Sequence, residues 1–207
     1  MAVLATDDFN RADNADLGAD WTPQQDGTNG GDNFEIVSNT AKSPEANDSC
    51  EQQVTATWPN DQWSEATLFN TNNSGQGAGS GVALRCAAVG TRTYYRFCAN
   101  ASGWTLGRLV GGTHTEIIGG TGTVWAAGDR VYLEVQGTTL VAKKNTTAGA
   151  GGTTVTTQTD ANIASGRAGI AHSTSDVDAA IDVWQGGDFA GAAAGPSPQR
   201  LTVLGVS

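Results

Sequence analysis

The chain has 207 residues, a formal net charge of −10 and a pI of about 4.4, and only 15% of its residues are charged. The acidity argues against nucleic acid as a partner, because phosphate contacts need clustered lysine and arginine residues. No apolar run approaches the roughly 20 residues of a membrane-spanning helix. The 28 glycines and the lack of any long helical stripe predict an all-β domain.

The opening segment MAVLATDDFNRAD predicts a first strand over 5–12, anchored by Phe9, with the next core contact at Trp21. It has neither a basic start nor a long apolar stretch, so we expect no secretory signal. Unless a leader was removed, the protein is then expected to be made in a cytoplasm and to leave it by lysis or assembly. Further strands are predicted at 34–37, 50–58 and 62–70.

The run from Gly81 to Gly112 predicts three strands separated by turns, because its strands alternate in side-chain type. If Gly90-Thr91 is a two-residue hairpin turn, one face of the first strand pair carries Ala83, Arg85, Ala87, Tyr94, Arg96 and Cys98. The other face, which we expect to be core, then carries Val82, Leu84, Cys86, Tyr95 and Phe97. The two arginines and the tyrosine are expected to face solvent or a ligand, but a three-residue turn would flip one strand relative to the other.

Three cysteines are present, Cys50, Cys86 and Cys98, and an odd number argues against a disulfide framework. The predicted hairpin places Cys86 and Cys98 on opposite faces, which forbids a bond between them. We therefore interpret Cys86 as a small core residue. No spacing of histidine and cysteine indicates a zinc site.

The second half of the chain continues the strand pattern, with strands predicted at 114–118, 130–135, 140–144, 154–159, 165–172 and 179–184. In the strand predicted at 130–135, Val131, Leu133 and Val135 face the core, and Tyr132 and Glu134 face outward. The glycine-rich segment 70–81 is either a mobile loop tip or a binding loop at one end of the domain.

The predicted domain covers residues 1–190, and a low-complexity linker separates it from the end of the chain. The tail, residues 191–207, ends in the apolar, strand-like segment RLTVLGVS. Such a segment either docks on a sheet edge of its own domain or of a neighbouring subunit, or it frays.

Five motifs follow one another in the order found in a known family: DDFNRADNADLGADWT, TYYRFCANASGWTLGRLVGG, DRVYLEVQGTTLVAKKN, SGRAGIAH and AAIDVWQGGDF. Over residues 5–190 the chain resembles the concanavalin A-like, laminin-G-type jelly-roll domains of phage and bacterial surface proteins. The resemblance implies a β-sandwich of two antiparallel sheets. It does not fix a function, because this scaffold hosts lectins, carbohydrate-binding modules, glucanases, lyases and virion proteins.

Catalytic motifs of that family are missing from the sequence. It lacks the E-x-D-x-x-E strand of laminarinase-type hydrolases, whose two carboxylates suit a retaining mechanism, and the Q-I-H and Y-F-K strands of alginate-lyase-type members. His114 and His172 have no acid–base partners nearby in the sequence. The remaining enzyme interpretation uses Glu65 and Glu134 as a carboxylate pair, and the alternative is that both are solvated or paired with arginine.

Sugar binding needs aromatic faces that stack on pyranose rings and planar polar groups that bind hydroxyls. The candidates are Trp63, Glu65, Arg85, Tyr94, Arg96, Tyr132 and Glu134. Trp63 shares strand parity with Phe69, so it is either a surface or a core residue. Trp104 fits either face, because the length of the turn before it is ambiguous.

In such jelly rolls the first and last strands are often neighbours. A structural calcium ion could then be held by Asp7, Asp8, Asn10 and Asp182, since hard cations bind clustered oxygen atoms. The alternative is that these side chains cap the N-terminal turn and carry surface charge. No other cofactor is implied.

Together these features predict a non-catalytic, lectin-like structural protein of a virion, either a capsid decoration or a tail-associated subunit. Its expected partners are other virion subunits, contacted through the tail, and host or environmental glycans, and we expect a homo-oligomer within an assembly. The expected location is the virion surface, or otherwise the extracellular space. The alternatives are a polysaccharide-degrading hydrolase or lyase, and a stand-alone carbohydrate-binding module.

Overall fold

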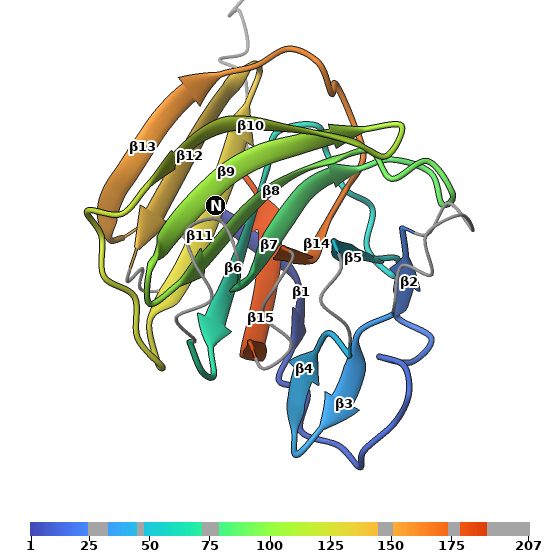
Figure 1. The fold of residues 1–207 in the computed structure, drawn as a ribbon. Coiled ribbons are helices and arrows are strands. Elements are labelled where there is room, and N and C mark those ends of the chain that lie inside the picture. Colours follow the sequence, from blue (N-terminus) through green and yellow to red (C-terminus); the bar gives the residue numbers. More distant parts are fainter. Residues whose placement is uncertain (25–32, 45–47, 72–78, 145–150, 174–178, 190–207) are drawn as a thin grey trace, which may run out of the picture.

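In the part of the chain that the computed structural model describes, fifteen strands form two antiparallel sheets that face each other (Figure 1). The structure describes residues 1–24, 33–44, 48–71, 79–144, 151–173 and 179–189. Within these ranges the chain is strand, turn and loop throughout, and none of it forms a helix long and apolar enough to cross a membrane. The predicted tail, 191–207, lies outside the described residues.

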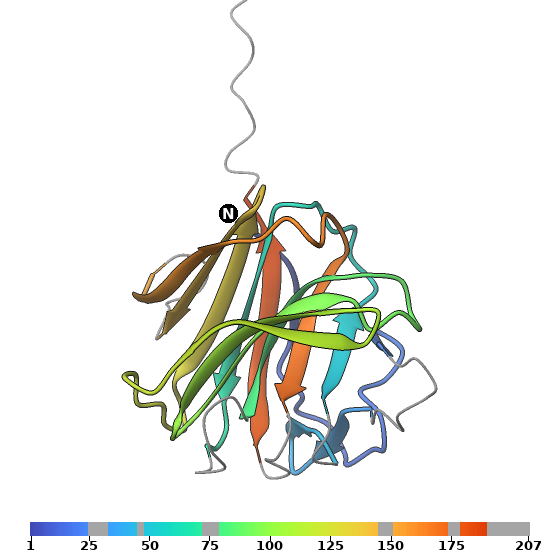
Figure 2. The same cartoon turned by 45° about the horizontal axis from the view of Figure 1, so that its top comes forward.

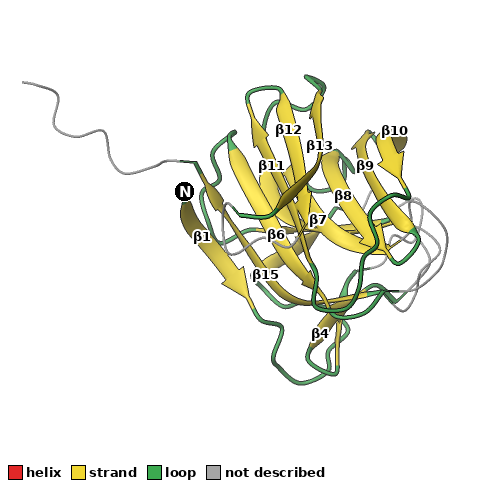
Figure 3. Cartoon of the chain, turned by 90° about the vertical axis from the view of Figure 1, so that its left-hand side faces the viewer, coloured by secondary structure: helices red, strands yellow, loops and turns green. Residues whose placement is uncertain are grey.

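One sheet has eight strands, and its order places sequence neighbours and distant segments side by side. It runs β13 (Thr153–Thr159), β12 (Thr139–Lys144), β11 (Arg130–Gln136), β6 (Gln62–Leu68), β15 (Ala180–Asp188), β4 (Thr40–Lys42) and β3 (Glu35–Val37), with β1 (Ala2–Asp7) also paired to β15. Figures 2 and 3 show the N-terminus beside the end of β15. The first and last described strands are therefore neighbours, as the sequence predicted.

The other sheet has seven strands and lies in front of the first in Figure 1. It runs β10 (Thr113–Gly120), β9 (Gly103–Val110), β8 (Tyr94–Asn100), β7 (Gly79–Cys86), β14 (Arg167–Ser173), β5 (Ser49–Gln53) and β2 (Trp21–Pro23). The predicted central run forms β7, β8 and β9 at the middle of this sheet.

The core lies between the sheets and is built from the alternate residues that the sequence pattern identified. From the seven-stranded sheet it receives Val82, Leu84, Tyr95 and Phe97, and from β11 Val131, Leu133 and Val135. Trp104, which the sequence left open, packs inside against Phe97, with 6.0 Å between ring centroids. Each such side chain contributes roughly 1.5–3 kcal/mol through the burial of apolar surface.

A tryptophan on the last strand ties the two sheets together. Trp184 packs edge-on against Trp21 at 4.8 Å between centroids. Its indole Nε1 donates to Ser64 Oγ of the neighbouring strand β6 at 2.8 Å, and Ser64 Oγ donates to the Gly169 carbonyl of the other sheet at 2.9 Å. The polar groups buried at this point are therefore satisfied across the sandwich.

Several strands near the N-terminus differ from the predictions. The first strand covers Ala2–Asp7 rather than 5–12, and Phe9 follows it with a φ of 51°, which ends the extended backbone. The strand predicted at 50–58 ends at Gln53. Two three-residue strands, β2 and β4, were not predicted as strands, because segments this short carry little periodicity.

The β7–β8 pairing differs from the predicted hairpin by two residues. A two-residue turn would pair Arg85 with Arg96, whereas Arg96 is opposite Ala83. The connection is longer, and the amide of Ala87 donates to the Thr93 carbonyl at 2.9 Å. A shift of two residues keeps every side chain on its predicted face, because side chains alternate with a period of two.

A bulge at Arg85 then changes the direction of the last residues of β7. Arg85 has a φ of 51°, and β7 has one residue more than β14 between the pairs Cys86–Arg167 and Ala83–Gly169. Gly166 fits tightly against this bulge, since a Cβ there would lie 2.3 Å from the Arg85 carbonyl carbon. The bulge moves Cys86 to the other face of the sheet, away from Leu84.

Candidate functional site

Four of the seven predicted glycan-binding residues lie together on the outer face of the eight-stranded sheet. Tyr132 is directly opposite Glu65, and Glu134 is opposite Trp63. These side chains point away from the core, because their neighbours along β11 fill it. Trp63 is therefore not part of the sandwich core, and its ring stacks on Tyr132 with 6.0 Å between centroids and 19° between planes.

The two carboxylates of this outer face each have a cationic partner. Glu65 Oε1 accepts from Arg130 Nη1 and Gln185 Nε2, both at 2.7 Å. Glu134 Oε2 accepts from the Tyr132 hydroxyl at 2.6 Å and from Lys143 Nζ at 3.1 Å. Glu65 is thus paired with an arginine, which was one of the two alternatives, whereas the partner of Glu134 is a lysine.

The outer-face residues are buried, and the expectation of exposed rings is wrong. Trp63 and Tyr132 are 0% exposed and Glu65 is 1% exposed. Met1 Sδ lies 4.0 Å from the Tyr132 hydroxyl oxygen, and Lys143 Nζ lies 4.9 Å from the Tyr132 ring centroid. Both rings are inaccessible to solvent, so the outer face does not present a bare stacking surface.

Burial changes the proton affinities on the outer face. It raises the pKa of Glu65, although the hydrogen bond from Gln185 and the charge of Arg130 act in the opposite direction. The second oxygen of Glu65, Oε2, is buried and has no hydrogen-bond partner in the described part of the chain. Burial, followed by the hydrogen bond to Glu134, raises the pKa of Tyr132.

Arg85 was predicted to face solvent, but it is 3% exposed and has a structural role. Its guanidinium donates to three backbone carbonyls: Asn60 from Nε at 3.0 Å, Ile163 from Nη1 at 2.7 Å and Gly137 from Nη2 at 2.7 Å. The side chain therefore holds three connecting segments together at one end of the sandwich.

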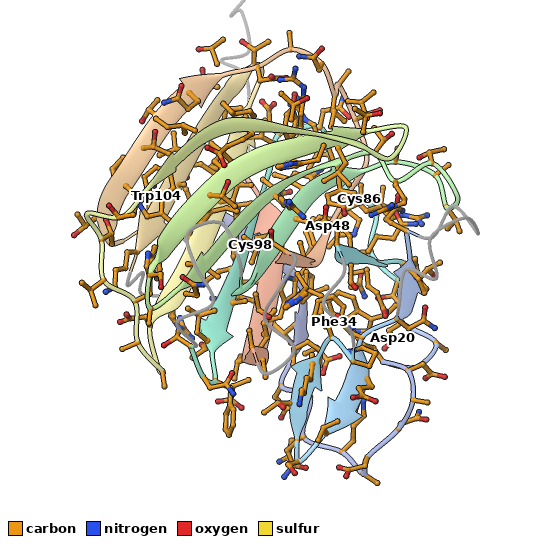
Figure 4. The ribbon with its side chains drawn as sticks, in the orientation of Figure 1. Asp20, Phe34, Asp48, Cys86, Cys98 and Trp104 are labelled. Atoms are coloured by element: carbon orange, nitrogen blue, oxygen red, sulfur yellow. The ribbon has the colours of Figure 1, made fainter. Side chains whose placement is uncertain are left out.

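Tyr94 and Arg96 lie on the predicted face of β8, but that face is covered. They are 0% and 2% exposed, and Tyr94 belongs to a second buried cluster formed by Cys50, Ala83, Cys86, Tyr94, Cys98, Leu109 and Ala171. Arg96 Nη1 binds Asp48 Oδ1 at 2.6 Å. Figure 4 shows Cys98 and Asp48 over the seven-stranded sheet. These two residues therefore stabilise the fold instead of presenting a ligand surface.

The prediction that Cys86 and Cys98 lie on opposite faces is wrong, because the bulge at Arg85 brings both into the second cluster. All three cysteines are buried free thiols, and Cys50 Sγ lies 3.6 Å from Cys86 Sγ. Burial raises the pKa of the Cys98 thiol to about 12. Thiols with such high proton affinity react slowly.

The predicted calcium residues do not gather into a cluster. Both oxygens of Asp7 are occupied: Oδ1 accepts from the Phe9 amide at 2.8 Å and from Arg11 at 2.7 Å, and Oδ2 accepts from Trp21 Nε1 at 2.8 Å. Asp8 caps a local turn by accepting from the amide of Asn10 at 3.1 Å. Asp182 is half-buried on β15. In the described ranges no three histidine, cysteine or acidic residues are placed to hold a metal ion, so the turn-capping interpretation holds for Asp7 and Asp8.

Two cavities share the segment Leu17–Ala19 in their linings. The larger, about 740 Å³, includes Asp7, Asp8 and Arg11 in its lining. The smaller, about 340 Å³, is bounded by Trp21 of β2 and Glu51 of β5, among others. Figure 4 labels Asp20, which lines the larger cavity, and Phe34, whose amide binds Glu51.

The sequence analysis did not identify Glu51. It is 2% exposed, and burial raises its pKa from 4.5 to about 8, with Asp16 adding to the shift. The alternation predicted for the strand 50–58 used Val54, Ala56 and Trp58 and made no statement about Glu51. Because the strand ends at Gln53, that alternation does not apply, and Glu51 faces inward.

Comparison with known proteins shows the fold but no family. No protein-family model and no curated protein matches the sequence. The carbohydrate-binding module CBM66 from Bacillus subtilis is similar in structure, with a TM-score of 0.58 at 14% identity over 81% of this chain and 94% of that one. The exoplasmic/lumenal domain of VIP36 in its Ca²⁺/Man3GlcNAc-bound form has a TM-score of 0.55 at 8% identity, over 84% and 86% of the two chains.

A third similar structure is the CBM2 module of the evolved Dit of Lactobacillus casei BL23 phage J-1, with a TM-score of 0.50 at 13% identity, over 89% of this chain and 94% of that chain. The predicted fold class, an all-β sandwich of two antiparallel sheets, is confirmed.

Replacement of Arg85 by methionine is expected to lower the free energy of unfolding by about 3 kcal/mol, because three backbone carbonyls, one of them the buried carbonyl of Ile163, lose their donor. Urea unfolding measures this change. The matched control is Arg167→Met at an exposed position of β14, for which we expect a change within about 0.5 kcal/mol. Equal effects of the two substitutions would contradict the structural role of Arg85.

Replacement of Glu51 by glutamine is expected to stabilise the protein increasingly as the pH rises. Between about pH 4.5 and 8 the unfolded chain loses this proton while the folded chain keeps it, so the wild type loses stability over that range. Glutamine carries no such proton and still offers an oxygen to the Phe34 amide. The difference in Tm between E51Q and the wild type should grow from pH 5 to pH 8, and Glu116→Gln on the exposed strand β10 is the matched control for the change of charge.

Proposed function

We propose that this chain is a non-catalytic, lectin-like domain that binds glycans through the outer face of the eight-stranded sheet. The observation that carries the proposal is the fixed network of polar groups on this face, formed by Glu65, Arg130, Gln185, Glu134, Tyr132 and Lys143. Carboxylate, amide and guanidinium groups held in place are suited to bind the hydroxyl groups of a sugar. The fold similarity to a carbohydrate-binding module and to a domain crystallised with Man3GlcNAc supports the same class of function.

The arrangement favours binding over catalysis. A general acid or nucleophile has to reach the substrate. The free oxygen of Glu65 is buried, and the other carboxylate, Glu134, already accepts from a hydroxyl and an ammonium group. Both carboxylates therefore serve to hold Arg130 and Lys143 in position, where these side chains border the solvent.

The finer proposal is that the domain is a virion component, displayed as a capsid decoration or as a tail-associated subunit. Its phage-like opening motif and its fold similarity to a module of a phage Dit support this assignment. Residues 191–207 would attach the domain to other virion subunits in a homo-oligomeric assembly, and the sandwich would contact host or environmental glycans. Its location would be the virion surface, or the extracellular space for a stand-alone module.

A glycan array measures the proposed binding, with Arg130→Lys and Lys143→Ala as test variants. We expect each to reduce binding about tenfold or more, because a hydrogen bond to a charged group contributes roughly 1.5–3 kcal/mol. The matched control is Glu116→Gln, which lies on the other sheet and should bind as the wild type does. Unchanged binding by both test variants would exclude the outer face as the glycan site.

The same glycans also separate binding from catalysis. The wild type is expected to release neither reducing ends nor unsaturated uronates. Product release that disappears in Glu65→Gln or Glu134→Gln would show a hydrolase or lyase and overturn the non-catalytic assignment.

Deletion of residues 191–207 tests the virion assignment. We expect the truncated protein to keep the Tm of the sandwich and to lose incorporation into assembled particles, since the proposed attachment resides in the removed segment. Incorporation is measured by the amount of protein that co-purifies with particles. A truncated protein that incorporates as the full chain does would contradict attachment through the tail.

A further inference from the structure

The smaller cavity has an acidic and aromatic lining and lies away from the outer face described above. It measures about 340 Å³ and is bounded by Trp21 and Pro23 of β2, Glu51 of β5, and the segment Asp16–Ala19. Pro23 is directly opposite Glu51 in the β2–β5 pair. The cavity is therefore built on two paired strands and one short loop, which hold its walls in place.

The described residues form one hydrogen bond with the Glu51 carboxyl, although a carboxyl has two oxygen atoms that can accept. Its Oε1 accepts from the amide of Phe34 at 2.6 Å, and no other hydrogen bond or ion pair to this carboxyl is formed by the described residues. The side chain is 2% exposed and lines the cavity. A buried carboxyl without a cation is costly to ionise, which agrees with its raised pKa of about 8.

The other carboxyl of the cavity, Asp16, is held at the rim. Its Oδ1 accepts from the Gly18 amide at 2.8 Å and from Asn14 Nδ2 at 3.1 Å. These donors are neutral, so they position the carboxyl and leave its charge unpaired. Trp21 adds an aromatic wall that is suited to contact a cation.

Trp21 also contacts another carboxylate, Asp7, whose charge is balanced by an arginine of the chain. Trp21 Nε1 donates to Asp7, and Asp7 is also held by both guanidinium nitrogens of Arg11, at 2.7 and 3.0 Å. One carboxylate beside Trp21 thus has a cation supplied by the chain. The other, Glu51, has none from the described residues.

We propose that the cavity binds a primary ammonium group, with Glu51 and Asp16 as acceptors and Trp21 as the aromatic wall. The ligand supplies the positive charge that Arg11 supplies to Asp7. A neutral sugar would leave both carboxyls without a cation, so the cavity favours an amine over the equivalent alcohol. The site does not depend on the proposed glycan-binding function, because it uses the inner face of β5.

Primary ammonium groups reach proteins from two sources, amino sugars and lysine side chains. The probes are therefore D-glucosamine and Nα-acetyl-lysine methylamide, each compared with a neutral isostere, D-glucose or Nα-acetyl-norleucine methylamide. Binding is measured by calorimetry and by the fluorescence of the tryptophans. We expect at least one amine to bind at least tenfold more tightly than its isostere, and the probe that binds identifies the source.

Glu51→Gln is expected to weaken amine binding about tenfold or more, because it removes a buried charge that faces the ammonium group. The matched control, Glu116→Gln, makes the same change of charge on β10 and should have no effect. Ala19→Trp fills the cavity from an exposed lining position, so it should abolish binding even if E51Q is poorly folded.

Binding of the lysine derivative should also tighten as the pH rises from about 6.5 to about 8.5, because ionised Glu51 binds the cation and the lysine ammonium keeps its proton over this range. Asp16 is the other titratable group lining the cavity, and the neighbouring thiol of Cys50 stays protonated because burial raises its pKa. E51Q should lack this pH dependence.

Several outcomes would overturn the proposal. These are failure of both amines to bind, equal binding of amine and isostere, and unchanged amine binding by Ala19→Trp. Loss of glycan-array binding in the outer-face variants, with amine binding kept, would separate the two sites.

Discussion

The buried guanidinium of Arg85 is the interaction on which one end of this sandwich depends. A buried cation is stable only when its donors are satisfied, and here three backbone carbonyls from segments far apart in the sequence satisfy them. The planar guanidinium has donors in several directions, which an ammonium group on a flexible stem does not offer in fixed geometry. The loop before β6, the β11–β12 hairpin and the segment before β14 are therefore positioned by one side chain. Gly166 is needed beside it because the backbone passes too close for a Cβ.

Alternation predicted the inner faces of the sheets and failed at identifiable places. It placed Leu84, Phe97 and Leu133 in the core correctly, since the period of two holds wherever the backbone stays extended. It failed after Arg85, where a positive φ changes the face of Cys86. No local pattern marks this arginine, because residues other than glycine rarely adopt that conformation.

The predicted glycan-binding residues on β8 were placed on the correct side of the sheet, but their exposure was not predicted correctly. Alternation states which side of a sheet a residue is on, but it does not state whether that side is covered. Tyr94 and Arg96 lie on the predicted side of β8 and are buried. The cover comes from contacts far apart in the sequence, such as the ion pair of Arg96 with Asp48, and these have no local signature. The grouping of Glu65 with Tyr132 was within reach of the sequence, because both follow from strand parity alone.

The carboxylates of the two proposed sites differ in whether a cationic side chain lies beside them. Glu65, Glu134 and Asp7 each lie within 3.1 Å of a cationic nitrogen, so their charge is balanced and their geometry is fixed. Glu51 is 2% exposed, and among the described residues only the Phe34 amide binds its carboxyl, whose pKa burial raises to about 8. A balanced carboxylate holds a basic side chain at a surface and so creates a binding face. An unbalanced one at the wall of a cavity leaves the positive charge to be supplied by a ligand.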